Sequence, residues 1–350
     1  MSEFLSVFRT ADRFQESQAN QEVELAPSPI FHIGDVPVHG DIIYAPMAGY
    51  ADVPTRTIYR SFGSALQYTE FVAADEILNG SPKVDKLLDY SFEEQPMVFQ
   101  IFGNDAHSLL EAALIVEDQK PQIIDINMGC STRRVSHRGS GVAMMRDLDL
   151  IERTFSLLSK HLHVPVTAKM RLGWEDNKNY IEVGKVLEGC GAAALTLHPR
   201  TKEQNYKGYA RWEAIAELKK AVSIPVIGNG DIYKPSHIDD MFISTGCDAV
   251  MIGRGAIGNP WIMSRIDRDE LPLANVTHCV RRHCNLMQDY YGSLGLTLFR
   301  KHLKRYFANM PDLGPIVKQL ITIECPHQFD RLLTQIEESF GGSLVGELAN

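Results

Sequence analysis

Short apolar runs alternate with amphipathic segments along most of this chain. The apolar runs are rich in β-branched residues, as buried strands are, and the segments between them have the spacing of helices that bury one face. We expect strands at residues 41–45, 66–70, 97–101, 122–126, 165–169, 193–197, 225–228 and 248–252. We expect helices at residues 105–119, 147–160, 178–189, 211–221 and 235–244. Eight β/α units of this length predict an α/β fold, a TIM (β/α)8 barrel.

An open, doubly wound sheet is the alternative, but no G-x-G-x-x-G sequence follows the first strand. Before the first strand, residues 31–38 read as a short hairpin that leads into the barrel. Residues 1–30 are polar and acidic and are predicted to form a mobile arm.

The β/α alternation stops near residue 271. From there the pattern predicts consecutive helices, with breaks at Gly292, Pro311 and Pro326. The expected organisation is therefore a barrel domain at 31–270 followed by a smaller, all-helical domain at 271–350.

The first expected strand runs into Pro46-Met47-Ala48-Gly49, and polar or glycine residues stand at the carboxyl ends of the other seven. TIM-barrel active sites are built at that end. The residues in question are Met47, Glu70, Gln100, Asn127, Lys169, His198, Asn229 and Arg254. Their convergence on one rim predicts an active site there.

The most informative strand end is the one before Cys130. The sequence Asn127-Met128-Gly129-Cys130 follows a buried strand and is succeeded by Arg133, Arg134, His137 and Arg138, with no acidic residue among them. A buried structural cysteine is the common alternative. A thiol on a glycine-containing, cationic loop is instead the setting of reactive cysteines, and the cations suit a polyanionic substrate.

The last two strand ends favour a phosphate site. Gly228, Gly230, Gly253 and Gly255 allow backbone N–H groups to approach a ligand, and Arg254 adds positive charge. Lys169, on a strand that should be buried, requires an anionic partner if it is to keep its proton. A phosphate beside a lysine that can stabilise an electron-rich ring suggests FMN as the cofactor.

Charge is distributed unevenly. The net charge is −9, but residues 271–320 hold seven basic and two acidic residues, a local balance of +5. The remaining 28 basic and 42 acidic residues give −14. A helix with one basic, solvated face is one interpretation, and a nucleic-acid-binding module is the other.

Composition narrows the setting of the protein. The six cysteines are scattered without a C-x-x-C pair, which predicts reduced thiols and a cytoplasmic location. No apolar run is long enough for a membrane span, and the first residues lack a secretory signal pattern. Cys279 and Cys284 are five residues apart on an expected helix and do not share a face, so no metal site is predicted.

Taken together, the motifs resemble those of the tRNA-dihydrouridine synthase family over about residues 41–310. They are Ala45-Pro46-Met47-Ala48-Gly49, Gln100 in VFQIFGN, the segment Asp125 to Cys130, Lys169-Met170-Arg171-Leu172-Gly173-Trp174, His198-Pro199-Arg200-Thr201, Asn229-Gly230-Asp231-Ile232, Gly253-Arg254, Asn259-Pro260-Trp261 and Arg300-Lys301-His302. One departure is Ser131, where the family usually has proline after the cysteine.

The resemblance implies an FMN-containing barrel, NADPH as electron donor, and tRNA as the partner, without an obligate protein partner. It implies reduction of the C5=C6 bond of a uridine, with hydride added at C6 and a proton delivered to C5 by Cys130. Flavin contacts are implied for Pro46, Met47, Ala48, Gln100, Lys169 and His198, and ribityl-phosphate contacts for Asn229, Gly230, Asp231, Gly253 and Arg254. Substrate contacts are implied for Asn127, Arg200, Arg133, Arg134, Arg138, Arg300, Lys301 and Lys304.

Three alternatives stay open at this point. The target uridine could lie in ribosomal RNA. A flavin reductase of a small molecule, of the dihydroorotate or enoate type, would use a similar barrel, although the basic loop 133–138 argues against it. An RNA-binding or folding factor that keeps the flavin site for structure alone is the third, and the presence of both Cys130 and Lys169 argues against it.

Overall fold

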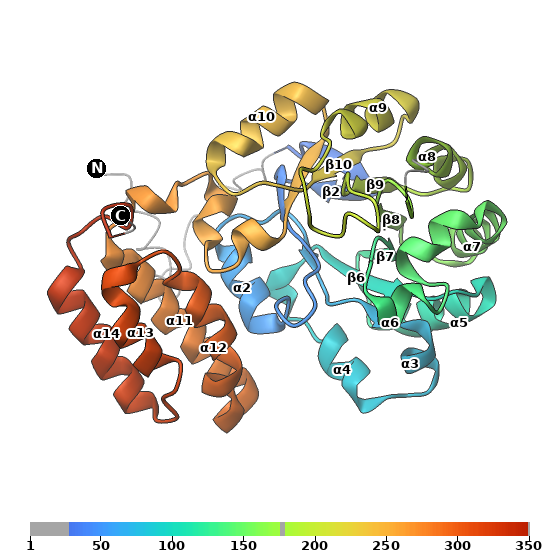
Figure 1. The fold of residues 1–350 in the computed structure, drawn as a ribbon. Coiled ribbons are helices and arrows are strands. Elements are labelled where there is room, and N and C mark those ends of the chain that lie inside the picture. Colours follow the sequence, from blue (N-terminus) through green and yellow to red (C-terminus); the bar gives the residue numbers. More distant parts are fainter. Residues whose placement is uncertain (1–27, 176–178, 349–350) are drawn as a thin grey trace, which may run out of the picture.

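The computed structural model describes residues 28–175 and 179–348. Its centre is a barrel of parallel strands that all run in the same direction (Figure 1). In barrel order the strands are β3 (Ile42–Tyr44), β11 (Ala249–Ile252), β10 (Val226–Asn229), β9 (Ala194–Leu197), β8 (Val166–Met170), β7 (Ile123–Met128), β6 (Met97–Phe102) and β4 (Gln67–Tyr68). Each coincides with one of the eight predicted strands, so the predicted TIM barrel is confirmed.

The barrel is nearly closed between β3 and β4. The N–H of Ala65 donates to the carbonyl of Ile42 at 2.8 Å, and the N–H of Tyr44 donates to the Ser64 hydroxyl at 2.9 Å. A short additional strand, β5 (Val72–Ala73), pairs with the end of β6. Strand β7 is buried at all six positions, as expected of a strand with helices outside and packed side chains inside.

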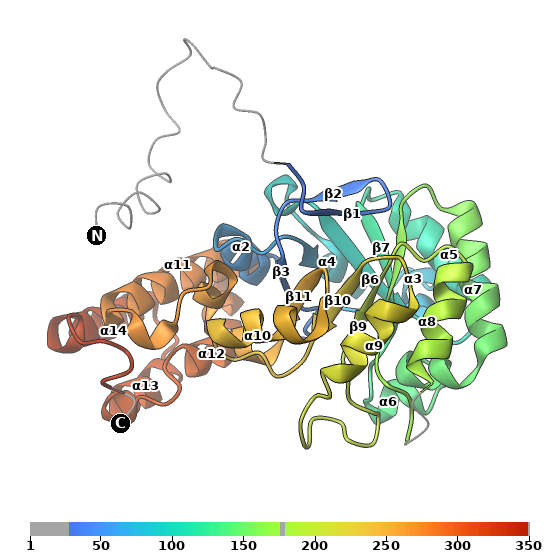
Figure 2. The ribbon, with the colours of Figure 1, turned by 90° about the horizontal axis from the view of Figure 1, so that it is seen from above.

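The predicted hairpin closes the amino-terminal end of the barrel. Strands β1 (Phe31–Ile33) and β2 (Val36–Val38) pair in antiparallel fashion. Ile33 and Val38 are fully buried with side chains from the barrel strands, among them Ile43. In Figure 2 the hairpin lies at the opposite end of the barrel from α6 (Arg133–Ser136), which follows Cys130. The active-site end therefore stays open.

Helices surround the barrel. They are α2 (Val53–Ser61), α3 (Ala74–Leu78), α4 (Pro82–Leu88), α5 (Ala106–Glu117), α7 (Leu148–His161), α8 (Tyr180–Gly189), α9 (Glu213–Ala221) and α10 (Pro235–Thr245). Of these, α5, α7, α8, α9 and α10 fall at the five predicted places, whereas α2, α3 and α4 were not predicted. Helix α7 begins where the Asp147 carboxylate accepts from the N–H of Leu150 at 2.9 Å. Just before α7, the apolar run Gly141–Arg146 forms a 3-10 helix.

The chain ends in a helical part that packs beside the barrel (Figures 1 and 2). It contains α11 (Leu273–Tyr291), α12 (Gly295–Tyr306), α13 (Gly314–Leu320) and α14 (Pro326–Phe340). The breaks fall at Gly292, Pro311 and Pro326, as predicted. These helices have a hydrophobic core of their own, which also takes in Ile58 of α2 and Trp261. That shared core fixes the helical part against the barrel.

Two further points concern the chain as a whole. Of the predicted arm at residues 1–30, residues 1–27 lie outside the described residues. Within the ranges that the structure describes, no helix has both the length and the apolar content needed to cross a membrane.

Candidate active site

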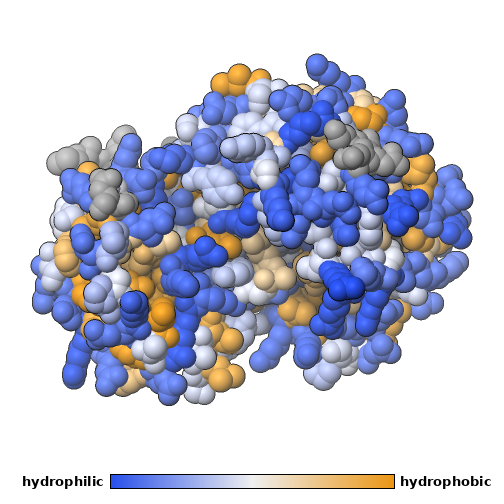
Figure 3. Space-filling view, viewed as in Figure 1, coloured by the Kyte–Doolittle hydropathy of each residue, from blue (hydrophilic) through white to orange (hydrophobic). Residues whose placement is uncertain are grey.

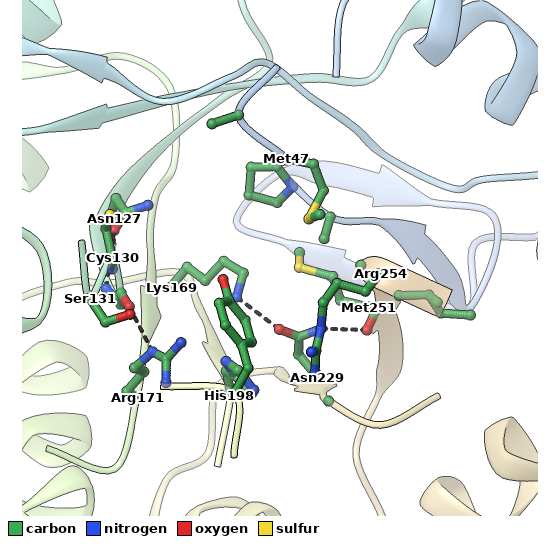
Figure 4. Close-up of a pocket in the computed structure, with 18 of the residues that line it drawn as sticks. Met47, Asn127, Cys130, Ser131, Lys169, Arg171, His198, Asn229, Met251 and Arg254 are labelled. Atoms are coloured by element: carbon green, nitrogen blue, oxygen red, sulfur yellow. Dashed lines mark hydrogen bonds between the residues drawn. The ribbon is translucent and has the colours of Figure 1, made fainter. Parts of the chain in front are cut away.

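A cavity of about 470 Å³ opens at the carboxyl ends of the barrel strands. It falls in the size range of small-molecule and cofactor sites. The space-filling view in Figure 3 shows pale and apolar side chains at the centre of this face, surrounded by hydrophilic ones. The close-up in Figure 4 shows Cys130 and Ser131 on one wall, Met251 and Arg254 on the opposite wall, and Lys169 and His198 between them.

The predicted cysteine lies in this cavity. Strand β7 ends at Met128, and the Asn127 side chain then turns the chain, because its Oδ1 accepts from the N–H groups of Gly129 at 3.1 Å and of Cys130 at 2.8 Å. The Cys130 thiol is partly exposed on the cavity wall, 3.2 Å from the Thr132 hydroxyl. The thiol is therefore held at the mouth of the barrel and is accessible to a ligand.

Behind Asn127 lies a chain of hydrogen bonds, which we call the carboxylate–amide relay (Thr167, Asp125, Gln100 and Asn127). The Asp125 carboxylate accepts from the Thr167 hydroxyl at 2.6 Å and from Gln100 Nε2 at 2.7 Å. Gln100 Oε1 in turn accepts from Asn127 Nδ2 at 2.8 Å. Because a carboxylate can only accept, it fixes the direction of both amides and leaves Asn127 Oδ1 facing the Cys130 backbone.

Burial also acts on the carboxyl group of this relay. Asp125 is fully buried, and burial raises the pKa of its carboxyl group to about 6, against the lowering effect of the hydrogen bonds from Thr167 and Gln100. Gln100 is also fully buried, and it lies behind the cavity wall rather than in it. Its predicted contact with a flavin stays a prediction.

Lys169 lies at the base of the cavity. Its Nζ donates to Asn229 Oδ1 at 2.9 Å, and Asn229 Nδ2 donates to the carbonyl of Met251 at 2.7 Å, so that the amide is fixed in orientation (Figure 4). Burial, and then the nearby Arg171, lower the pKa of Lys169 to about 8. Among the described residues, the ammonium group has no carboxylate within ion-pair distance, and its hydrogen-bond partner is the Asn229 amide.

His198 and Arg200 follow strand β9 but face different surroundings. Burial, and then Arg171, lower the pKa of His198 well below its ordinary value, so the imidazole is neutral. His198 lines the cavity, whereas Arg200 lies behind it with 2 % exposure and donates to both oxygens of Asp231, at 2.8 and 2.7 Å. Arg200 therefore supports the Asp231 turn.

Two glycine-containing turns form the wall beside β10 and β11. Gly230 and Asp231 have φ angles of +128° and +57°, and a Cβ at Gly230 would approach Ala210 Cβ to 2.9 Å. A Cβ at Gly253 would enter the cavity, 3.3 Å from Met47 Sδ. Pro46 and Ala48 line the same side. The backbone of both turns is thus open to close approach by a ligand.

Tyr206 belongs to the cavity wall but was not predicted. Its ring lies under two guanidinium groups, those of Arg254 at 4.4 Å and Arg171 at 5.5 Å. Further wall residues that the sequence analysis did not assign are Phe71, Thr132, Asn205, Tyr233 and Met251. All six follow a barrel strand or lie at its end, and that position was the signal available in the sequence.

The predicted RNA-contacting cations occupy different surroundings. Arg133 lines the cavity, and Arg134 and Arg138 are exposed beside it on the same loop. On α12, Lys304 is exposed, whereas the Nζ of Lys301 lies 5.5 Å from the centre of the Tyr50 ring. Arg300 donates to the carbonyls of Thr322 and Ile323, at 3.3 and 2.9 Å.

Helix α11 carries the histidines and cysteines considered for a metal. His283 Nδ1 lies 3.0 Å from the Tyr306 hydroxyl, and its Nε2 lies 3.3 Å from the Thr55 hydroxyl, so its ring links the helical part to α2. Cys279 and Cys284 are both buried. In the portion of the chain that the structure describes, no group of three or more His, Cys, Asp or Glu side chains is arranged to hold a metal ion.

Comparison with known proteins agrees with this geometry. The chain is 38% identical over 305 residues to tRNA-dihydrouridine synthase B of Xanthomonas campestris pv. campestris, covering 83% of this chain and 92% of that protein. It is 33% identical over 333 residues to probable tRNA-dihydrouridine synthase 1 of Synechocystis sp., covering 90% and 93%. Among solved structures, 2-naphthoyl-CoA reductase shares the fold, with a TM-score of 0.53 at 12% identity over 67% of this chain and 50% of that one.

A family model adds the last comparison. The model described as Dihydrouridine synthase (Dus) matches residues 43–335, which include the barrel strands from the second residue of β3 onward and most of the helical part. The match extends over the cavity and its walls. The chain therefore belongs to the dihydrouridine synthase (Dus) family.

Proposed function

We propose that this protein is an FMN-dependent tRNA-dihydrouridine synthase that reduces the C5=C6 bond of uridine with NADPH as the electron donor. Family membership and the names of the curated relatives support the reaction and the substrate. The single observation that carries the proposal is the presence of a thiol, a buried lysine and two open glycine turns in one cavity at the active-site end of the barrel.

The cavity suits a flavin mononucleotide. Its walls bring four cations, Arg133, Lys169, Arg171 and Arg254, together with one carboxylate, Asp231, which Arg200 already neutralises. Such a surplus of positive charge favours a phosphate and a ring that becomes anionic on reduction. We assign the phosphate to the turns at Gly230 and Gly253, and the polar edge of the ring to Lys169.

The remaining walls fit the two faces of a planar ring. Pro46, Met47 and Ala48 form an apolar side, and we propose that they lie along the flavin. Cys130, Asn127 and His198 line the part of the cavity left for the substrate base. When bound, the flavin supplies the hydride that adds to C6 of the uracil.

The proton required at C5 is the task of the protein. We assign it to the Cys130 thiol, which lines the cavity and whose hydroxyl neighbour Thr132 is 3.2 Å away. The Asn127 turn fixes the position of this thiol relative to the ring. His198 is neutral, so it can donate or accept a hydrogen bond to the base without adding charge beside the arginines.

We propose that exposed cations bind the phosphate backbone of the RNA. Arg134 and Arg138 lie beside the cavity, and Lys304 is exposed on α12, so the cations suit a phosphate backbone that runs from the cavity to the helical part. The target base must leave its stack to enter the cavity, which costs a few kcal/mol that backbone contacts offset.

The test is anaerobic. The holoenzyme is reduced with NADPH, unmodified tRNA is added, and reoxidation is followed at the flavin absorbance band, with dihydrouridine detected in the RNA by mass spectrometry. We expect rapid reoxidation by tRNA and almost none by free uridine or orotate. Reoxidation by a small enone or orotate but not by tRNA would establish the small-molecule reductase instead, and a response to ribosomal RNA alone would change the substrate.

The role of Cys130 needs a separate variant. Cys130→Ala should abolish turnover while leaving flavin content and tRNA binding unchanged, because the thiol supplies a proton and not a binding contact. Cys325→Ala, a partly exposed cysteine of the helical part, is the matched control and should turn over normally. Normal turnover by Cys130→Ala would refute the assignment of the proton donor.

A further inference from the structure

Two loops that are far apart in the sequence are joined directly beside the thiol. The Ser131 hydroxyl donates to Asn205 Oδ1 at 2.9 Å, across 74 residues of sequence. Ser131 is the residue after Cys130 in the loop that follows β7, and Asn205 lies in the loop that follows β9. Both residues line the cavity, and Figure 4 shows Ser131 beside Cys130 on the wall above Arg171.

The loop after β9 is a firm support. The Arg171 guanidinium donates to the carbonyls of Thr201 at 3.0 Å and Asn205 at 2.8 Å. The N–H of Lys202 donates to the carbonyl of Gly173 at 2.9 Å, so this loop is also hydrogen-bonded to the chain that follows β8. Arg171 is itself buried, with 2 % exposure.

The loop that carries the thiol is more exposed, although the N–H of Val142 donates to the Cys130 carbonyl at 3.2 Å and Asn104 Nδ2 donates to the Arg138 carbonyl at 2.7 Å. Residues Ser131, Thr132, Arg133 and Arg134 are partly or fully exposed. Arg171 Nε reaches the carbonyl of Gly129 at 2.8 Å, and Asn127 holds the N–H of Cys130. After Cys130, the bond from Ser131 is the first side-chain contact that attaches this loop to another loop in the described structure.

We propose that Ser131 and Asn205 are positioning residues that hold the Cys130 thiol against the cavity, a pair we call the Ser131–Asn205 clamp. This inference rests on the proposed function of Cys130 as proton donor. The clamp fixes the first residue after the thiol to a loop that Arg171 has already made rigid.

The backbone of Asn205 favours this assignment. Its φ angle is +50°, a left-handed conformation in which asparagine is enriched and most other side chains are strained. That conformation lets the residue present its carbonyl to Arg171 and its side-chain oxygen to Ser131 at the same time. Glycine tolerates the same φ, so Asn205→Gly removes the side-chain oxygen without imposing strain.

The test measures thiol access separately from catalysis. The oxidised holoenzyme without tRNA is treated with iodoacetamide, and alkylation of each cysteine is followed by peptide mass spectrometry. The partly exposed Cys190 and Cys325 serve as internal references in every sample. The test variants are Ser131→Ala, Asn205→Gly and the double variant. Ser131→Thr keeps a hydroxyl at position 131, and Ser236→Ala, at an exposed position on α10, is the control.

One partly exposed hydrogen bond corresponds to about a two- to tenfold change in an equilibrium or rate. We expect Ser131→Ala and Asn205→Gly each to raise Cys130 alkylation by about that factor, with no change at Cys190 or Cys325. Each should lower kcat for tRNA by a similar factor at nearly constant KM, because the thiol is misplaced while RNA contacts persist. The double variant should be no worse than either single one, and Ser131→Thr should behave as the wild type.

Three results would overturn the proposal. The first is unchanged alkylation of Cys130 in both single variants. The second is a double variant in which the two effects on alkylation multiply. The third is a Ser131→Thr variant whose Cys130 alkylation or kcat differs from that of the wild type. A wild-type turnover by Cys130→Ala would instead refute the proposed function, and the alkylation measurement would still decide whether the clamp holds the loop.

Discussion

The carboxylate–amide relay makes a directional prediction that two isosteric substitutions can test. In Asp125→Asn, the new side-chain oxygen still accepts from Gln100 Nε2, and the new amide can donate to the Thr167 hydroxyl, which rotates to accept. In Asn127→Asp, the N–H groups of Gly129 and Cys130 keep their acceptor, but a buried carboxylate faces Gln100 Oε1, which lies 2.8 Å from Asn127 Nδ2 in the native chain.

The two costs differ in size. In Asp125→Asn, the hydrogen bonds with Gln100 and Thr167 are kept, the latter with its direction reversed, and a buried charge is removed. The free energy of unfolding should therefore change by less than about 1 kcal/mol. Asn127→Asp leaves two acceptors opposed at a site with 7 % exposure, and a Gln100 flip only moves the conflict to Asp125. An unsatisfied buried group costs about 1–3 kcal/mol and a charged one more, so we expect a loss of at least about 2 kcal/mol.

The double variant, which combines Asp125→Asn with Asn127→Asp, is the decisive case. In it Gln100 can flip, accept from the introduced amide and donate to the introduced carboxylate, so every bond of the relay is made in the reverse direction. The double variant should therefore recover most of the loss of Asn127→Asp, a coupling of about 2 kcal/mol.

Urea unfolding of the flavin-saturated protein measures these free energies, and activity is not the readout because residue 127 lines the cavity. A double variant no more stable than Asn127→Asp, or an Asp125→Asn that loses as much as Asn127→Asp, would refute the relay as drawn.

Three more predictions follow from the charges. Lys169 has its pKa lowered to about 8, so flavin affinity should fall as pH rises from 7 to 9, whereas Lys169→Met should bind weakly and without this dependence in a fluorescence titration. Lys304→Met should weaken tRNA binding and reduce its salt slope by about one, whereas Lys301→Met, whose Nζ lies over the Tyr50 ring, should change that slope less. Burial lowers the pKa of His302 to about 3, so the folded protein resists a proton that the unfolded chain accepts below about pH 6.5, and stability should fall by up to about 1.4 kcal/mol per pH unit between pH 6.5 and 3. His302→Gln should show a shallower loss in urea unfolding at pH 7, 6 and 5, and equal slopes would contradict the pKa shift.

The barrel could be predicted because its signal is local. Each strand is a short apolar run, each helix has one apolar face, and Gly292, Pro311 and Pro326 interrupt the pattern where the helices end. Strand ends meet at one rim in any parallel barrel, which is why Cys130 and Lys169 could be placed in one cavity without knowledge of distances. The boundary of the helical domain at residue 271 stays a prediction.

The sequence could not show which side chains near the strand ends point into the cavity and which are buried behind its wall. Gln100 and Arg200 were grouped with the ligand-contacting residues on the resemblance to the family, and neither lines the cavity. In the structure the Gln100 side chain is hydrogen-bonded to Asp125 and Asn127. The Arg200 side chain is hydrogen-bonded to Asp231. A buried residue that completes another residue's hydrogen bonds carries the same sequence signal as one that contacts a ligand.

Tyr206 and Asn205 line the cavity, but they were not assigned from the sequence. They lie in a polar loop that has no periodicity and no apolar run, so apart from their position after a strand nothing in the local pattern distinguishes them from solvent-exposed residues. Their place in the cavity depends on Arg171, which comes from a different strand and fixes the loop through the carbonyls of Thr201 and Asn205. Such an arrangement is set by three segments at once and is visible only in the folded chain.

The Cys130 loop depends both on buried side chains of the barrel and on a loop that another segment holds in place. It is supported from within the barrel by Asn127, whose orientation is set by the buried Asp125, and from the side by Asn205, whose loop is set by Arg171. The two supports act at different atoms, one on the N–H of Cys130 and the other on the side chain of the residue that follows it. Loss of either should therefore loosen the thiol without releasing the whole loop, and the effects of Asn127 and Asn205 variants on Cys130 alkylation should multiply, in contrast to the non-multiplying pair Ser131 and Asn205.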